Sequence, residues 1–124
     1  MTDTVMTGTG GFHVTSLTDL NDQFEELQNG TGGIELHPGI TAYPVLWSNG
    51  SVKEAFVCFD AGARYPVPDR HDTSAELLVV IDGDLDCDAN GTCPPGTLIY
   101  GPRGSSHYPG TRYGCVVHVF YPDL

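Results

Sequence analysis

Turn-forming dipeptides that contain glycine recur along this chain and limit the length of any regular element between them. After Gly33 they stand at Pro38-Gly39, Asn49-Gly50, Ala61-Gly62, Asp82-Gly83, Asn90-Gly91, Pro95-Gly96 and Pro109-Gly110. Such pairs favour tight turns, because glycine adopts backbone angles that other residues avoid. Short extended runs lie between them, at 34–36, 40–47, 52–59, 76–81, 84–87, 97–100 and 115–121. Seven short strands at this spacing predict an all-β sandwich or small barrel.

One segment before the strands has the pattern of an amphipathic helix. Its apolar residues recur at three- and four-residue spacing: Leu17, Leu20, Phe24 and Leu27. Ser16 can cap its start and Gly30 can end it, so we expect a helix over residues 17–28 on the outside of the sheet. Residues 1–31 should comprise a flexible N-terminus and this helix, and residues 32–124 the barrel. At 124 residues, both parts belong to a single domain.

The charge balance restricts the partners. Sixteen acidic against five basic residues give a formal net charge of −11. This disfavours binding to nucleic-acid phosphates and to anionic membrane surfaces, both of which need lysine and arginine. A small-molecule substrate, or a cation held by carboxylates, fits the balance better.

The N-terminus has no basic region followed by an apolar run, and no stretch is long and apolar enough to span a membrane. We therefore expect a cytoplasmic protein, in which thiols stay reduced. The four cysteines are expected to be buried free thiols. Because Cys87 and Cys93 flank the Asn90-Gly91 turn, a disulfide between them is the alternative.

Four side chains of the types that bind metal ions lie in two segments of the chain. Asp69 and His71 are two residues apart, so in an extended segment they leave the same face. Glu76 begins an apolar run, where an uncompensated carboxylate would be costly to bury. His107 follows a Pro-x-Gly turn after another strand. If these strands are neighbours, the four converge on one point, and the set suits Fe(II), Mn(II), Zn(II) or Ni(II).

The same segments resemble the two motifs of the cupin family. Glu76, six residues and Gly83 are similar to the latter half of the first motif. Gly96, five residues, Pro102-Arg103-Gly104, two residues and His107 are similar to the whole second motif. Together with the Gly-Ala-Arg-Tyr-Pro segment, the Glu-Leu-Leu-Val-Val-Ile strand and the Pro-Arg-Gly-Ser-Ser-His turn, residues 33 to 121 look most like the ChrR-type cupins.

The resemblance implies a jelly-roll β-barrel with metal ligands at His71, Glu76 and His107. The family has His-x-His in its first motif, whereas this chain has Asp69-Arg70-His71, so Asp69 stands where the first histidine would be. If Asp69 binds, the second carboxylate favours the harder ions Fe(II) and Mn(II). If it does not, three protein ligands remain. In the alternative of a cupin without metal, the two histidines are hydrogen-bonded pocket residues.

Three further residues are weaker candidates for a catalytic role. His118 alternates with Val116 and Phe120 on the last strand, so it faces either the pocket, as proton donor or support for a ligand, or the solvent. Arg64 either meets an anionic substrate or pairs with surface acids. Tyr65 either lines the cavity or packs as an ordinary half-buried side chain.

Several functions follow from the resemblance. Acetylacetone-cleaving and related dioxygenases of the family cut carbon–carbon bonds beside a carbonyl with non-haem Fe(II). This implies a metal-dependent enzyme acting on a small organic, diketone-like substrate, with isomerase or cyclase chemistry as a variant. The ChrR proteins themselves are zinc-binding anti-sigma factors, so a zinc-binding sensor module is an alternative. A metal-free binding protein is another. Small cupins often pair through their sheets, which implies a homodimer.

Overall fold

The computed structural model describes residues 6–7, 13–30, 32–47, 49–88 and 91–124 of the chain. The elements of this part are β1 (Met6–Thr7), β2 (His13–Val14), α1 (Leu17–Gly30), β3 (Ile34–His37), β4 (Ile40–Leu46), β5 (Val52–Phe59), β6 (Asp69–Arg70), β7 (Glu76–Gly83), β8 (Leu85–Asp86), β9 (Thr92–Cys93), β10 (Leu98–Gly101), β11 (Ser106–His107) and β12 (Cys115–Phe120). Among these residues, no helix has the length and apolar character needed to cross a membrane.

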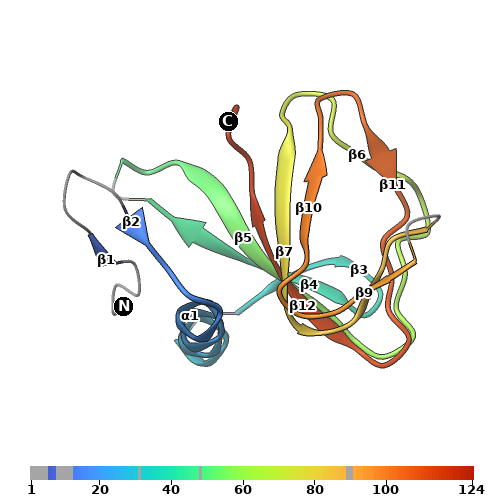
Figure 1. Ribbon diagram of the computed structural model, residues 1–124, viewed down its shortest axis with the longest axis horizontal. Coiled ribbons are helices and arrows are strands. Elements are labelled where there is room, and N and C mark those ends of the chain that lie inside the picture. The colour runs from blue at the N-terminus through green and yellow to red at the C-terminus, as the bar shows by residue number, and fades with distance from the viewer. Residues whose placement is uncertain (1–5, 8–12, 31, 48, 89–90) are drawn as a thin grey trace.

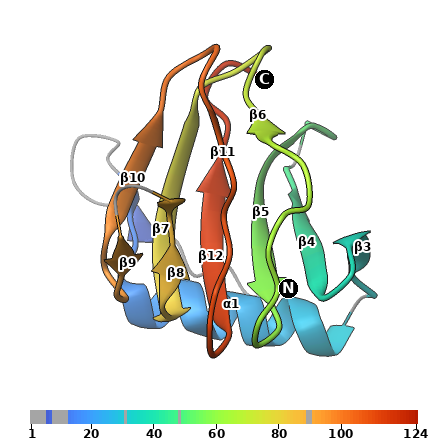
Figure 2. The ribbon, with the colours of Figure 1, turned by 90° about the vertical axis from the view of Figure 1, so that its right-hand side faces the viewer.

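One antiparallel sheet organises the molecule. Its strand order is β10-β7-β12-β5-β4-β3, so β12, the last strand of the chain, lies in the middle of the sheet. The helix α1 lies on one side of this sheet, while the two-stranded ladders β6–β11 and β8–β9 lie on the other (Figures 1 and 2). The sheet is therefore covered on both faces, and the interior of the barrel lies on the side of the short ladders.

Side chains that alternate along the central strands supply two separate cores. On β12, Val117 and Val119 point into the barrel, where they join a buried cluster with Phe59 and Leu78. Val116, on the other face, packs with the helix. The helix-side cluster consists of Phe24, Val45, Phe56, Ile81 and Val116. Because successive side chains of a strand point to opposite faces, nearly continuous apolar runs are needed where both faces are buried.

The helix is fixed to the sheet by its cap and by one aromatic side chain. The backbone N–H of Asp19 donates to Ser16 Oγ over 3.1 Å, and the N–H of Ser16 donates to a carboxylate oxygen of Asp19 over 3.0 Å. This reciprocal pair satisfies donors that would otherwise be unpaired at the helix start. Phe24 is buried, with its ring edge-on to Tyr43 and tilted against Phe56.

The structure agrees with most of the expected elements. All seven expected strands are present within one or two residues, and the helix extends to Gly30 instead of residue 28. The two-residue strands β1, β2, β6, β9 and β11 were not expected, because they are too short to carry an alternating pattern. All four cysteines are free thiols, so the Cys87–Cys93 disulfide is not formed. The expectation of a flexible N-terminus falls largely on residues 1–14, most of which lie outside the described part.

Candidate metal centre

The four predicted metal-binding side chains come from three segments that the fold brings together. Asp69 belongs to β6 and stands directly opposite His107 of β11 in the antiparallel ladder. His71 follows β6 immediately, and Glu76 is the first residue of β7. The short ladder therefore presents both histidines and Asp69 to the end of the central sheet from which Glu76 projects.

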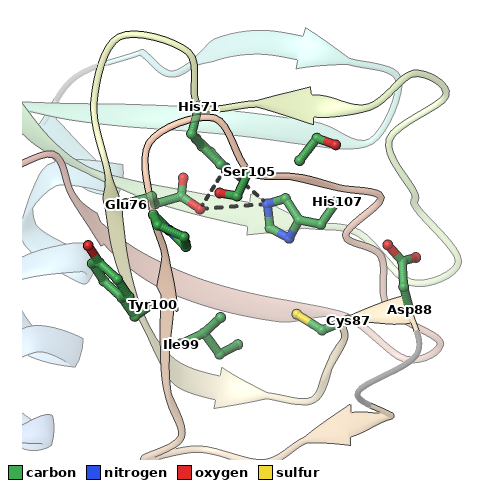
Figure 3. Close-up of a pocket in the computed structure, with 11 residues that line it drawn as sticks. His71, Glu76, Cys87, Asp88, Ile99, Tyr100, Ser105 and His107 are labelled. Atoms are coloured by element: carbon green, nitrogen blue, oxygen red, sulfur yellow. Dashed lines mark hydrogen bonds and ion pairs between the residues drawn. The ribbon is translucent and has the colours of Figure 1, made fainter.

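The ligand-type atoms of this cluster converge closely. His71 Nε2 lies 3.2 Å from Glu76 Oε1 and 3.3 Å from His107 Nε2. His107 Nε2 lies 3.2 Å from Asp69 Oδ2, and Figure 3 shows His71, Glu76 and His107 directed at one another. One atom from each of the four residues lies within 4.8 Å of the others. Two imidazole nitrogens and two carboxylate oxygens at these separations can surround a single divalent cation.

The electrostatics of the cluster also fit a cation. Only 5% of the His71 and Glu76 side chains is exposed, against 25% for Asp69. The hydrogen bond to Glu76 is the main cause that raises the pKa of His71, and burial acts in the opposite direction. Two carboxylates held this close to each other in a partly buried site repel one another unless a positive charge is shared between them. A divalent ion among the four side chains would provide that charge.

Backbone hydrogen bonds hold the ligand-bearing segments in place. The N–H of His71 donates to Ser105 O over 3.0 Å, and the N–H of Gly104 donates to His71 O over 2.7 Å. On the other side of the cluster, the N–H of Ala75 donates to Asp123 Oδ2 over 2.9 Å, which fixes the entry to Glu76. The candidate ligands therefore depend on backbone anchors that sit outside the cluster.

Two cavities meet at the cluster, and Glu76 and His107 line both. One has a volume of about 300 Å³ and is bordered by the β10–β11 turn and by polar groups such as Asp88 and Ser105 (Figure 3). We call it the outer cavity. The other, of about 150 Å³, lies in the barrel interior and is mostly apolar. We call it the inner cavity; its wall includes Ala42, Val57, Phe59, Leu78, Val117 and Val119.

Tyr65 lines the inner cavity, which was one of the two roles considered for it. It also packs on Phe59 and His37. Tyr121 lies in the same wall. Burial, together with the negative charges of Asp69 and Glu76, raises the pKa of both tyrosine hydroxyls. Both phenols therefore keep their protons at neutral pH, and each hydroxyl is able to donate a hydrogen bond beside the cluster.

His118 and Arg64 do not join the cluster. His118 lies on the helix side of the sheet, where its ring contacts Phe56 and its Nε2 lies 2.6 Å from Glu54 Oε2. Of the two orientations considered for His118, the one into the pocket is wrong, because His118 shares its face of β12 with Val116 and not with Val117. Arg64 pairs with Asp86 and donates to Tyr108 O over 2.7 Å. Of the two roles considered for Arg64, this is the pairing with surface acids.

The structure adds residues to the site that the sequence had not assigned. Ser105 and Cys87 line the outer cavity, and Tyr121 lines the inner one. Tyr121 could have been found by extending the alternation of Val117 and Val119 by two residues. Ser105 lies in the turn that resembles the second cupin motif, but no periodic signal distinguishes it from Ser106.

Comparisons with known proteins support the fold. No family model matches the sequence, and no curated protein does so. A solved RmlC-like cupin from Shewanella frigidimarina is similar at 16% identity and a TM-score of 0.61, covering 76% of this chain and 86% of that one. The likeness, together with the mostly β-sheet structure, shows that the chain has the jelly-roll cupin fold.

Two other similar structures have different roles. The complex of SigE with the anti-sigma ChrR from Rhodobacter sphaeroides matches at 14% identity and a TM-score of 0.66, over 82% of this chain but only 55% of that one. The polyketide cyclase RemF from Streptomyces resistomycificus matches at 19% identity and a TM-score of 0.61, over 77% of this chain and 76% of that one. At these identities the likeness concerns the fold, which hosts both regulators and enzymes.

Proposed function

We propose that this chain is a metal-dependent enzyme that acts on a small, uncharged organic substrate. The observation that carries the proposal is the convergence of Asp69, His71, Glu76 and His107 within 4.8 Å, at the point where two cavities meet. A purely structural metal site needs no adjoining space, whereas a catalytic site keeps room for a substrate beside the ion. The position of the cluster between two cavities therefore favours catalysis.

The lining of the cavities supports the substrate class. Neither cavity has a lysine or arginine among its described lining residues, so nothing there would neutralise a carboxylate or phosphate. The inner cavity offers an apolar wall for a hydrocarbon body and the hydroxyls of Tyr65 and Tyr121 for a neutral oxygen. A carbonyl compound with a short apolar body matches this arrangement.

Within this class, we favour a non-haem Fe(II) dioxygenase of diketone-like compounds. The resemblance to ChrR-type cupins supports this reaction, and the second carboxylate, Asp69, suits the harder ions Fe(II) and Mn(II). When bound, such an ion supplies Lewis acidity and, for iron, redox chemistry with dioxygen. The protein's part is to hold the substrate oxygen near Glu76 and His107, to donate hydrogen bonds from the two tyrosines, and to exclude water with the apolar wall.

A second candidate, a zinc-binding sensor module, is favoured by a different feature. The four candidate ligands are enough to close a tetrahedral zinc site without any open position. The fold shared with ChrR in its SigE complex adds to this alternative. Isomerase or cyclase chemistry remains a variant of the enzyme proposal, and the polyketide cyclase RemF supports it at the level of fold.

The test of the enzyme proposal is dioxygen consumption by Fe(II)-reconstituted protein in the presence of pentane-2,4-dione, followed with an oxygen electrode. We expect consumption that depends on both iron and the diketone and that is lost in His107→Ala. Arg64→Ala, which alters a basic residue outside the cluster, serves as the matched control and should retain the rate. If the iron-loaded protein consumes no oxygen with a panel of diketones, the dioxygenase proposal is wrong. Zinc bound without open positions would support the sensor instead.

A further inference from the structure

One hydroxyl beside the cluster is buried without a partner. Among the residues that the structure describes, Ser105 Oγ is the buried side-chain oxygen that makes no hydrogen bond. A hydroxyl carries one donor and two acceptor positions, and leaving all of them unmet away from water costs free energy. Such a group calls for a specific explanation, for example a ligand that is bound only when the protein works.

Backbone hydrogen bonds hold the segment that carries this hydroxyl. The N–H of Ser105 donates to Pro102 O, and the carbonyl of Ser105 accepts from the N–H of His71, both over 3.0 Å. The backbone of Ser105 is therefore hydrogen-bonded directly to the backbone of a candidate metal ligand. Its side chain lies beside His71 and Glu76 in the outer cavity (Figure 3).

Gly101, the last residue of β10, leaves space for the Ser105 hydroxyl because it has no side chain. A Cβ atom on Gly101 would lie 2.9 Å from Ser105 Oγ and 3.7 Å from His71 Cδ2. Gly101 has no positive φ, so its backbone does not demand glycine. The reason for glycine here is steric: a Cβ atom would press on the hydroxyl, while its distance to His71 is an ordinary van der Waals contact.

We propose that Ser105 binds the electronegative atom of a small ligand that enters the outer cavity and reaches the metal cluster. The hydroxyl donates a hydrogen bond to that atom, an oxygen in the case of a substrate. Because the hydroxyl is neutral, it adds no charge to a site that already holds two carboxylates. The inner cavity then receives the apolar body of the substrate, and the outer cavity its small polar part. This inference rests on the proposed metal site, and it assigns Ser105 a role in ligand binding instead of metal retention.

The test uses protein loaded with Co(II) as a spectroscopic probe and azide as the ligand, because azide binds metal ions and accepts hydrogen bonds. Visible absorption reports Co(II) binding first and azide binding in a second titration. We expect Ser105→Ala to weaken azide binding about 10-fold, the loss of one hydrogen bond to a charged group, and to leave Co(II) affinity within about twofold. Ser105→Thr, which retains a hydroxyl, should recover most of the azide affinity.

Thr18→Ala is the control, since it removes the hydroxyl of an exposed residue of α1 that lines neither cavity, and it should leave azide binding unchanged. Equal azide affinity in the wild type and Ser105→Ala would overturn the role of Ser105 while leaving the metal site intact. If the wild type shows no Co(II) absorption at all, the metal proposal itself fails, and the role of Ser105 fails with it. The two failures are thus read from different titrations.

Discussion

Glu54 illustrates how a single residue responds to its surroundings on the helix side of the sheet. Burial alone would raise its pKa, but hydrogen bonds from His118 and Trp47 and the charge of His118 outweigh burial and hold the pKa below its usual value of 4.5. Trp47 Nε1 donates to Glu54 Oε1 over 2.8 Å, and His118 Nε2 lies 2.6 Å from Oε2. The carboxylate of Glu54 on β5 thus links two side chains, that of Trp47 just after β4 and that of His118 on β12.

The substitution Glu54→Gln tests this network through pH. A lowered pKa in the folded state stabilises the protein above the unfolded value of 4.5, and that contribution is lost as the pH falls through the folded pKa. We therefore expect Glu54→Gln to be less stable by about 1–2 kcal/mol at neutral pH, with a difference that shrinks below pH 4.5. Urea unfolding at several pH values measures this. The exposed Glu25→Gln is the control, and a difference that is independent of pH would contradict the account.

Among individual residues, the sequence predicted the four candidate metal ligands better than the other candidate site residues. His71, Glu76 and His107 were identified because a motif and a chemical type coincide there, and Asp69 because a carboxylate stands where the motif has its first histidine. The alternation along β12 showed that His118 shares a face with Val116, but alternation does not reveal which face is the barrel interior. That assignment depends on where α1 packs, and α1 is remote in sequence. Ser105 was missed because an unpartnered hydroxyl is a property of three-dimensional packing alone.

Gly83 shows how an element boundary depends on one residue. It ends β7 opposite Cys115 of β12, close to the bulge between Val116 and Val117. Its φ is +70°, and a Cβ atom would lie 2.1 Å from the carbonyl oxygen of Gly114. Glycine is required here both for the backbone angle and for the close approach of the two strands.

We expect Gly83→Ala to reduce the free energy of unfolding by more than about 2 kcal/mol, since backbone strain and a clash with another backbone act together. Gly62→Ala is the matched control. Its φ is similar, at +80°, but no atom lies within 4 Å of the added methyl group. The control should lose only about 1 kcal/mol. Equal losses in denaturant unfolding of the two variants would show that the contact with Gly114 is unimportant.

The elements themselves were largely predictable because turns and apolar runs are local features. The seven main strands and α1 follow from glycine-containing dipeptides and from alternating or helical spacing. The ladder β6–β11 does not, although it brings Asp69 opposite His107. Two-residue strands form where neighbouring segments already hold the backbone, so their existence depends on the assembled fold and not on local pattern.

For the whole molecule, the cluster links segments that are distant in the chain. Asp69 and His107 are 38 residues apart, and a bound ion would connect both to the start of β7.

The homodimer remains a prediction, which sedimentation equilibrium with and without metal can test. Any ion that binds the folded chain and not the unfolded one must also stabilise the fold by mass action.

Metal content is the measurement that tests the central claim most directly. Protein expressed without an affinity tag is analysed for metals by mass spectrometry, before and after reconstitution with Fe(II), alongside Asp69→Ala and His107→Ala. We predict about one divalent ion per chain in the wild type and its loss in His107→Ala, because removal of one of four ligands opens the site. Retention in Asp69→Ala would limit the ligands to the other three. Failure of the wild type to bind any divalent ion, even after reconstitution, would contradict the account.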